Sequence, residues 1–191
     1  MKLLLTVVLL ICSSFSLADN VLNTLSDAKS YYKNKKFKEA QTALEDATTL
    51  IQQKRGKSLQ ETLPKALSGW TENQSKLQAV GKGMFGGALT VFKRYKKGRS
   101  QIKVSVITDS PIIQSYLGAF SNTFLNAGGG ELIRESSTKK GHLKYQENRR
   151  RGNLSSIIDN RFLLKIEGRQ VDKKHLLSYF KAIDFKKIKA L

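Results

Sequence analysis

Apolar residues are spaced in two different ways along this chain, and the two spacings leave few fold classes open to it. Between Asp19 and Arg55 there is no proline or glycine, and apolar residues recur three or four positions apart, as on one face of a helix. From Ala88 to Thr108 apolar and polar residues alternate, which is typical of strands with one buried face. The sequence therefore predicts a helical part followed by a sheet.

The first spacing predicts a helical hairpin over residues 19–56. A polar break at Lys33-Asn34-Lys35 separates two amphipathic helices, and Gly56 is expected to end the second helix. Small, aromatic and apolar positions of the hairpin include Ala28, Tyr31, Tyr32, Phe37, Ala40, Ala43, Leu44 and Ala47. This string resembles one tetratricopeptide unit. Because a lone unit cannot bury its own face, we expect the hairpin to pack on the rest of the chain or against a partner.

Residues 57–68 are predicted to be a linker, and residues 69–191 a second domain with Trp70 in its core. The expected strands cover 88–96, 101–108, 131–135, 141–147, 153–158 and 161–167. Capping residues predict helices that begin at Asp109-Ser110-Pro111 and at Asp172. Strands joined by hairpins, with helices between them, indicate the α+β class: a mainly antiparallel β-sheet covered by helices, in an α/β sandwich.

The first 18 residues have the layout of a cleavable secretory signal peptide. Lys2 is followed by the apolar run Leu3–Ile11, and Ser16 and Ala18 supply small residues before a cut at Asp19. The run is shorter than the roughly 20 apolar residues that a permanent membrane anchor needs. We therefore expect an exported protein, periplasmic or secreted, with no transmembrane anchor after cleavage.

Two other interpretations of this segment stay open. It could be an uncleaved anchor or a buried helix, or a lipoprotein signal with Cys12 as the lipidated residue. Ile11 stands where a lipoprotein signal normally has a small residue, so the lipoprotein interpretation is the weaker one. Cys12 is the only cysteine, and its removal with the signal would leave a mature chain without disulfides.

The chain is strongly basic, with 34 Lys and Arg residues, 15 Asp and Glu residues and a formal net charge of +19. The excess gathers in two runs, over 93–103 and 139–151, and the C-terminal tail adds Lys181, Lys186, Lys187 and Lys189. The candidate residues for binding an anionic surface are Lys93, Arg94, Lys96, Lys97, Arg99, Lys139, Lys140, Arg149, Arg150 and Arg151. The alternative is that these cations are solvated and have no binding role.

Such a charge attracts anionic lipid headgroups, acidic glycans and nucleic acid alike. Nucleic acid is the least favoured of these targets, because exported proteins seldom meet it. The expected partners are therefore an unidentified envelope protein or an anionic surface.

No pattern of residues indicates catalysis, a cofactor or a metal. The string Gly81–Gly86 fits a dinucleotide-binding motif but leads into a strand rather than a helix. His142 and His175 are the only histidines and are too few for a zinc site without further ligands. Ser110 lacks a nucleophile elbow. Three glutamates could in principle form a glycosidase pair, without a reason to select two of them: Glu131, Glu135 and Glu147.

Short strings spread over residues 63–191 resemble a group of exported bacterial proteins of unknown function. They include Leu63-Pro64, Gly69-Trp70, Met84-Phe85-Gly86-Gly87, Asp109-Ser110-Pro111, Gly168, Val171, Leu176-Leu177 and Ala182-Ile183-Asp184. The layout is also similar to the Mog1/PsbP-like α/β/α sandwich. The resemblance implies that fold, an envelope location and a role in binding or assembly. The sequence thus predicts an exported, non-enzymatic binding or assembly module, with anionic-surface binding or an unrecognised hydrolase activity as alternatives.

Overall fold

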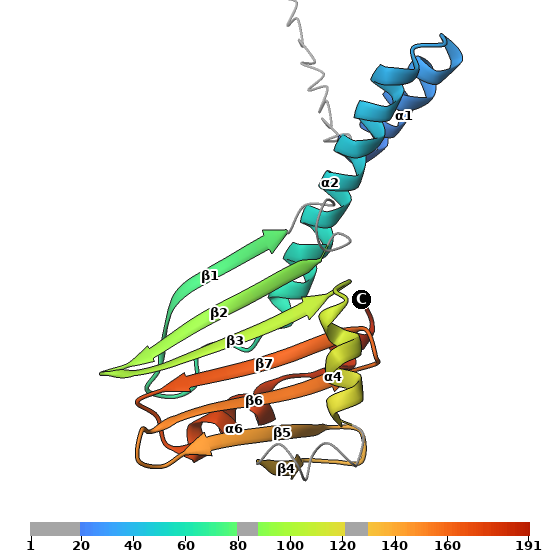
Figure 1. Cartoon of the computed structure of the whole chain (residues 1–191). Coiled ribbons are helices and arrows are strands. Elements are labelled where there is room, and N and C mark those ends of the chain that lie inside the picture. Colours follow the sequence, from blue (N-terminus) through green and yellow to red (C-terminus); the bar gives the residue numbers. More distant parts are fainter. Residues whose placement is uncertain (1–19, 80–87, 121–129) are drawn as a thin grey trace, which may run out of the picture. The chain divides into compact units, whose positions relative to one another are not determined.

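The computed structural model describes residues 20–79, 88–120 and 130–191, which form two compact units that divide between Leu50 and Ile51 (Figure 1). The expected signal peptide, the Gly81–Gly86 string and the predicted helix stop at 127–130, apart from Gly130, lie outside these residues. Within the described ranges, no helix combines the length and the apolar character needed to cross a membrane.

The first unit is a helical hairpin, as the sequence predicts. Helix α1 (Asn20–Lys33) and the first part of helix α2 (Phe37–Glu61) are joined by a three-residue turn. The residues buried in this unit are nearly all small: Val21, Ala28, Ala40, Ala43 and Ala47. Small residues let the two helices approach closely, and they leave the bulkier apolar residues of the hairpin at the surface.

The predicted end of the second helix at Gly56 is wrong, because α2 continues to Glu61. A glycine inside a helix costs about 1 kcal/mol relative to alanine. Leu59, which follows Gly56 by one turn, is only 2 % exposed and belongs to the core of the second unit. Burial of Leu59 offsets the local cost, and the helix ends just before Pro64.

The second unit is built on a seven-stranded antiparallel sheet in the order β1-β2-β3-β7-β6-β5-β4. Its strands are β1 (Thr71–Ala79), β2 (Leu89–Lys97), β3 (Ser100–Thr108), β4 (Glu131–Arg134), β5 (Lys140–Gln146), β6 (Arg151–Ile158) and β7 (Phe162–Arg169). The predicted α+β class and mainly antiparallel sheet are confirmed. Sequence patterns missed β1, an edge strand whose polar residues show no alternation.

One face of the sheet, which we call the covered face, holds the hydrophobic core. Helices α6 (Lys173–Ala182) and α7 (Phe185–Lys189) pack on it, together with the last turn of α2 and the segment before β1. Trp70 lies in this core, as predicted. The core residues of the helices are Leu176, Tyr179, Phe180, Ile183, Phe185 and Ile188.

Among the residues that the structure describes, one helix covers one end of the opposite face, which we call the open face. Helix α4 (Ile112–Phe120) lies across β7 and β6 on the side of the sheet away from α6 (Figure 1). Beneath it, Ile113 of α4 and Leu163 of β7 are buried outside the main core. The helix predicted from Asp109-Ser110-Pro111 is therefore present, and its role is to close this end of the open face.

Candidate anion-binding site

Strand register orders the open face into rows of cross-strand neighbours. The row nearest the β2–β3 turn is Lys96, Gln101, Arg169, Arg151 and Gln146. The next row is Arg94, Lys103, Glu167, Asn153 and Lys144. The third is Phe92, Ser105, Lys165, Ser155 and His142, and the fourth, towards α4, is Thr90, Ile107, Leu163 and Ile157. The face thus changes from basic and exposed to apolar and covered.

Topology brings the two basic sequence runs to the same end of the sheet. Neighbouring strands are antiparallel. The β2–β3 turn, the last residue of β7 and the β5–β6 turn therefore lie at the same end of the strands. We call this end of the sheet, together with the first two rows of the open face, the basic end. Its cations are Arg94, Lys96, Lys97, Arg99, Lys103, Lys144, Arg149, Arg150, Arg151 and Arg169. They outnumber the acids there, Glu147, Glu167 and Asp172.

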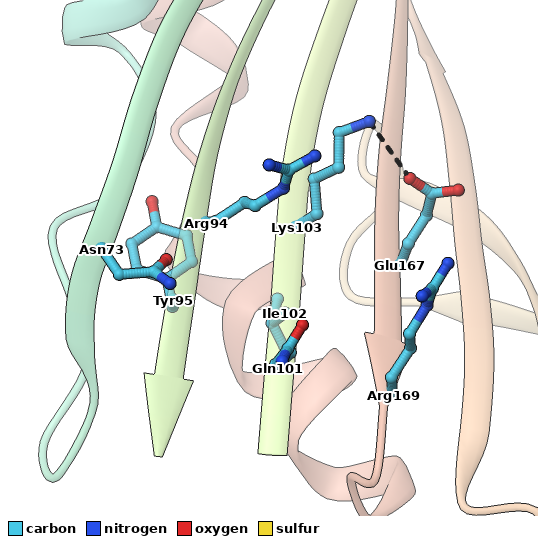
Figure 2. Close-up of a pocket in the computed structure, with 8 residues that line it drawn as sticks. All are labelled: Asn73, Arg94, Tyr95, Gln101, Ile102, Lys103, Glu167 and Arg169. Atoms are coloured by element: carbon cyan, nitrogen blue, oxygen red, sulfur yellow. Dashed lines mark ion pairs between the residues drawn. The ribbon is translucent and has the colours of Figure 1, made fainter. Parts of the chain in front are cut away.

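Two cations of the basic end are held in place by an aromatic ring. The Arg94 Cζ atom lies 4.9 Å and the Lys103 Nζ atom 5.0 Å from the centroid of the Phe92 ring. Phe92 is 7 % exposed, so these contacts cover it and also fix the direction of both side chains. Lys103 in addition lies 3.6 Å from a carboxylate oxygen of Glu167. Figure 2 shows Arg94 directed from β2 over β3, and Lys103 directed from β3 towards Glu167 of β7.

A hollow of about 470 Å³ opens at the basic end (Figure 2). It is lined by Asn73, Arg94, Tyr95, Gln101, Ile102, Lys103, Glu167 and Arg169. Three of these side chains are cations, two carry a neutral amide and one is a carboxylate. The hollow therefore offers several hydrogen-bond donors and a net positive charge to an anionic group.

Cations stand directly opposite one another at this end. Arg94 pairs with Lys103 across β2 and β3, and Arg151 pairs with Arg169 across β6 and β7. Like charges directly opposite in a sheet are destabilising. Neither Arg151 nor Arg169 forms an ion pair with any residue that the structure describes. The fold therefore keeps an unfavourable arrangement that a bound anion would relieve.

Not every candidate cation reaches this site. Lys93 lies on the covered face, where its Nζ atom is 3.5 Å from Glu72 and its side chain is 14 % exposed. Lys140 is exposed, but it begins β5 at the strand end remote from the β5–β6 turn. These two residues fall outside the basic end because strand alternation and direction, which the charge runs alone do not reveal, decide where each side chain lies.

Lys139 is a structural residue. Its Nζ atom donates hydrogen bonds to the carbonyl oxygens of Lys181 (2.8 Å) and Ile183 (2.6 Å) at the end of α6. It also lies within 5.4 Å of the ring centroids of Phe180 and Phe185. Burial lowers the pKa of Lys139. Its charge therefore stabilises the C-terminus of α6 and is not available to a ligand.

Arg150 also has an internal role. It adopts a left-handed backbone conformation (φ 44°) in the β5–β6 turn, and its guanidinium donates to a carboxylate oxygen of Asp172 at 2.8 Å. Its carbonyl oxygen accepts from the Val171 amide. Asp172 begins α6 as predicted, but its side chain makes no capping hydrogen bond. Arg150 thus links the β5–β6 turn to the start of α6. The neighbouring Arg149 is exposed.

The remaining candidates lie where the two runs meet. Lys96 and Arg151 are exposed on the open face, and Lys97 and Arg99 flank Gly98 in the β2–β3 turn. Three members of the basic end, Lys103, Lys144 and Arg169, were not among the candidates. Lys144 lies inside the second basic run. Lys103 lies inside the first basic run, so the run itself was the signal for it. Arg169 stands alone in sequence, and only strand pairing places it beside Arg151.

The residues weighed for catalysis lie apart from one another. His142 is on the open face of β5, whereas His175 is on α6 over the covered face, where its ring meets Trp70. Glu131 pairs with Lys173 and Glu135 with Lys181. Within the described ranges, no three His, Cys, Asp or Glu side chains are grouped in a way that could hold a metal ion.

Buried phenols lie in the core beneath the basic end. The Tyr95 hydroxyl donates to the Pro64 carbonyl oxygen (2.6 Å), and the Tyr179 hydroxyl accepts from the Leu67 amide. Burial raises the pKa of both groups, that of Tyr179 to about 12, so they stay protonated at neutral pH. These residues anchor the segment before β1 to the sheet.

The chain was compared with known proteins, and no family model, curated protein or solved structure matches it.

Proposed function

We propose that this chain is an exported, non-catalytic binding module of the cell envelope, and that its basic end binds a polyanion. The observation that carries the proposal is the pairing of like charges at that end, Arg94 with Lys103 and Arg151 with Arg169. Like charges directly opposite each other weaken a sheet, so these pairs do not serve its stability. A ligand with repeated phosphate or carboxylate groups would remove this repulsion when it binds, and the relief would add to its affinity.

The shape of the site favours an extended ligand. The exposed cations run from the β2–β3 turn, across β7, to the β5–β6 turn, which is the full width of five neighbouring strands. The hollow beside Arg94, Lys103 and Arg169 would take one anionic group, and the exposed row would follow the rest of the polymer. Because the chain is expected to be exported, the ligand class that we propose is the acidic glycans and phosphate polymers of the envelope.

Binding to inorganic polyphosphate and to immobilised heparin at several salt concentrations tests the proposal. The test variant replaces Lys96, Arg151 and Arg169 with glutamine. The matched control replaces Lys65, Lys186 and Lys187, which are exposed cations outside the basic end. We expect the test variant to bind at least about tenfold more weakly and to show a shallower salt dependence, because fewer counterions are released.

The control variant should bind like the parent chain. Equal losses in both variants would mean that binding follows the net charge, and the basic end would then not be a site. Retention of full affinity by the test variant would contradict the proposal directly. Circular dichroism of each variant shows whether the sheet has been preserved.

A further inference from the structure

The turn of the helical hairpin combines exposed aromatic rings with a cluster of lysines. Tyr31, Tyr32 and Phe37 are 38 %, 66 % and 60 % exposed. The cations around them, all exposed, are Lys29, Lys33, Lys35, Lys36 and Lys38. No acidic residue occurs between Asp27 and Glu39. This group, which we call the hairpin turn, lies wholly in the first unit and shares no residue with the basic end.

The rings are not part of the hairpin's own packing. The buried positions of the hairpin are small residues, among them Ala28, Ala40 and Ala43, which are at most 7 % exposed. Tyr32 and Phe37 meet edge to face across the turn, with ring centroids 5.7 Å apart. The two rings therefore form one exposed apolar point at the end of the hairpin, made from residues on both helices.

The turn that carries these residues has a defined backbone. The amides of Lys35 and Lys36 donate to the carbonyl oxygens of Tyr32 and Tyr31 at 3.0 Å, and Lys35 has a φ of 58°. The Asn34 side chain donates to the Ser30 carbonyl oxygen. Binding would cost little backbone conformational entropy, because the turn already holds the rings and the lysines together.

We propose that the hairpin turn docks on an anionic phospholipid surface. Aromatic side chains with an apolar body settle at the level of lipid headgroups, and lysines beside them are attracted to the negative surface. A soluble polyanion would use the lysines but would give Tyr32 and Phe37 no apolar environment. A second copy of the chain docked turn against turn would bring two lysine clusters together. The bilayer surface is the occupant that matches both kinds of side chain.

The inference is tested on the processed chain that begins at Asp19, with vesicles of phosphatidylcholine alone and of phosphatidylcholine mixed with phosphatidylglycerol. We expect binding only to the mixed vesicles. Replacement of Tyr32 and Phe37 by serine should weaken it roughly tenfold or more, given the transfer free energy of large apolar side chains. Replacement of Lys35 and Lys36 by glutamine should weaken it and reduce its salt sensitivity.

Matched controls lie on the second unit. Lys186→Gln with Lys187→Gln removes the same charge from α7, and Ile112→Ser removes an apolar side chain that is 46 % exposed. Neither control should change vesicle binding. A Phe37→Trp variant supplies a second readout that does not depend on weakened binding. Its added fluorescence should shift to shorter wavelength with mixed vesicles and stay unchanged with phosphatidylcholine alone.

The outcomes separate this inference from the polyanion site. Loss of vesicle binding in the Tyr32 and Phe37 variant, with polyphosphate binding retained, supports it. An equal loss of polyphosphate binding overturns it in favour of a soluble polyanion. A vesicle affinity that falls only in the Lys96, Arg151 and Arg169 variant overturns it in favour of the basic end. A dimer in sedimentation equilibrium that the serine variant abolishes overturns it in favour of self-association.

Discussion

The two faces of the sheet are made from alternate residues of the same strands, and their chemistry differs. In β7, Leu164 and Ile166 point into the core of the covered face, whereas Lys165 and Glu167 belong to the open face. On the covered face, α6 packs on β6 and β7 and α7 packs on β6, over the hydrophobic core. The open face is closed by α4 at one end and is basic at the other. One stretch of sequence thus supplies core residues on one side and an exposed basic surface on the other.

This comparison implies that substitutions on the two faces have separable effects. Changes on the covered face should alter the free energy of unfolding, whereas changes at the basic end should alter ligand affinity.

The largest effect on stability is expected at Gly168. A Cβ atom there would lie 2.5 Å from Val171 Cγ2 and 2.8 Å from Leu176 Cδ2. Gly168 is also paired across the sheet with Gly152, which is crowded by Leu176 as well. Gly168→Ala should lower the free energy of unfolding by about 1–3 kcal/mol, the usual cost of overpacking a core, as measured by urea denaturation.

Gly118 provides the control for that substitution. It lies in α4, and a Cβ atom there would meet no atom within 4 Å. Gly118→Ala should stabilise the chain slightly, because alanine is the better helix former. If Gly168→Ala leaves stability unchanged, then α6 does not sit as closely on the sheet as its contacts with Gly168 and Gly152 require.

A smaller effect is expected from titration of His175 on the covered face. Its ring packs edge to face against Trp70 with centroids 5.4 Å apart, and burial is the main cause that lowers its pKa. The unfolded chain, in which histidine has its ordinary pKa of about 6.5, then takes up a proton first as the pH falls. Stability should therefore be full above that value and should be lost as the pH drops towards the folded-state pKa.

Urea denaturation at about pH 7.5 and about pH 5 measures this loss. His175→Phe keeps an aromatic ring against Trp70 and removes the titration, so its stability should depend less on pH. Some dependence should remain, because burial also lowers the pKa of His142. An unchanged pH dependence in the variant would show that His175 does not contribute.

The sequence predicts the covered face better than the basic end, and the reason is physical. Alternation over β2 and β3 and the helical stripe of α6 are local signals, because each records which side chains meet the core. Strand β1 has no such signal, since it lies at the edge of the described sheet, beside β2, and its exposed residues are polar. Gly56 is a local stop signal that the packing of Leu59 overrides.

The basic end was predictable only in part. The two charge runs are visible in sequence, but their meeting at one edge depends on strand order, which is a long-range property. Lys139 illustrates the limit, because its place in a basic run conceals its bonds to the end of α6. Arg169 illustrates the reverse case, since its partner Arg151 is brought to it by pairing between β6 and β7.

The smallest effect on stability is expected at Arg169. This residue also tests most directly the difference between the covered face and the basic end. Its direct opposition to Arg151 is unfavourable, so Arg169→Gln should raise the free energy of unfolding by a few tenths of a kcal/mol, about the size of a cross-strand pair term. The same change should weaken polyphosphate binding. Stability and affinity would then move in opposite directions, which no substitution on the covered face is expected to do.

Lys165 on the same strand and the same face is the matched control. It stands opposite Ser105 and Ser155 rather than another cation, so Lys165→Gln relieves no like-charge pair. Its stability should stay within about 0.5 kcal/mol of the parent chain, as for most surface substitutions. If Arg169→Gln instead destabilises the chain while Lys165→Gln does not, Arg169 would have a structural role like that of Arg150. Arg94 and Lys103 would then be the pair of opposed cations at the basic end that lacks a structural explanation.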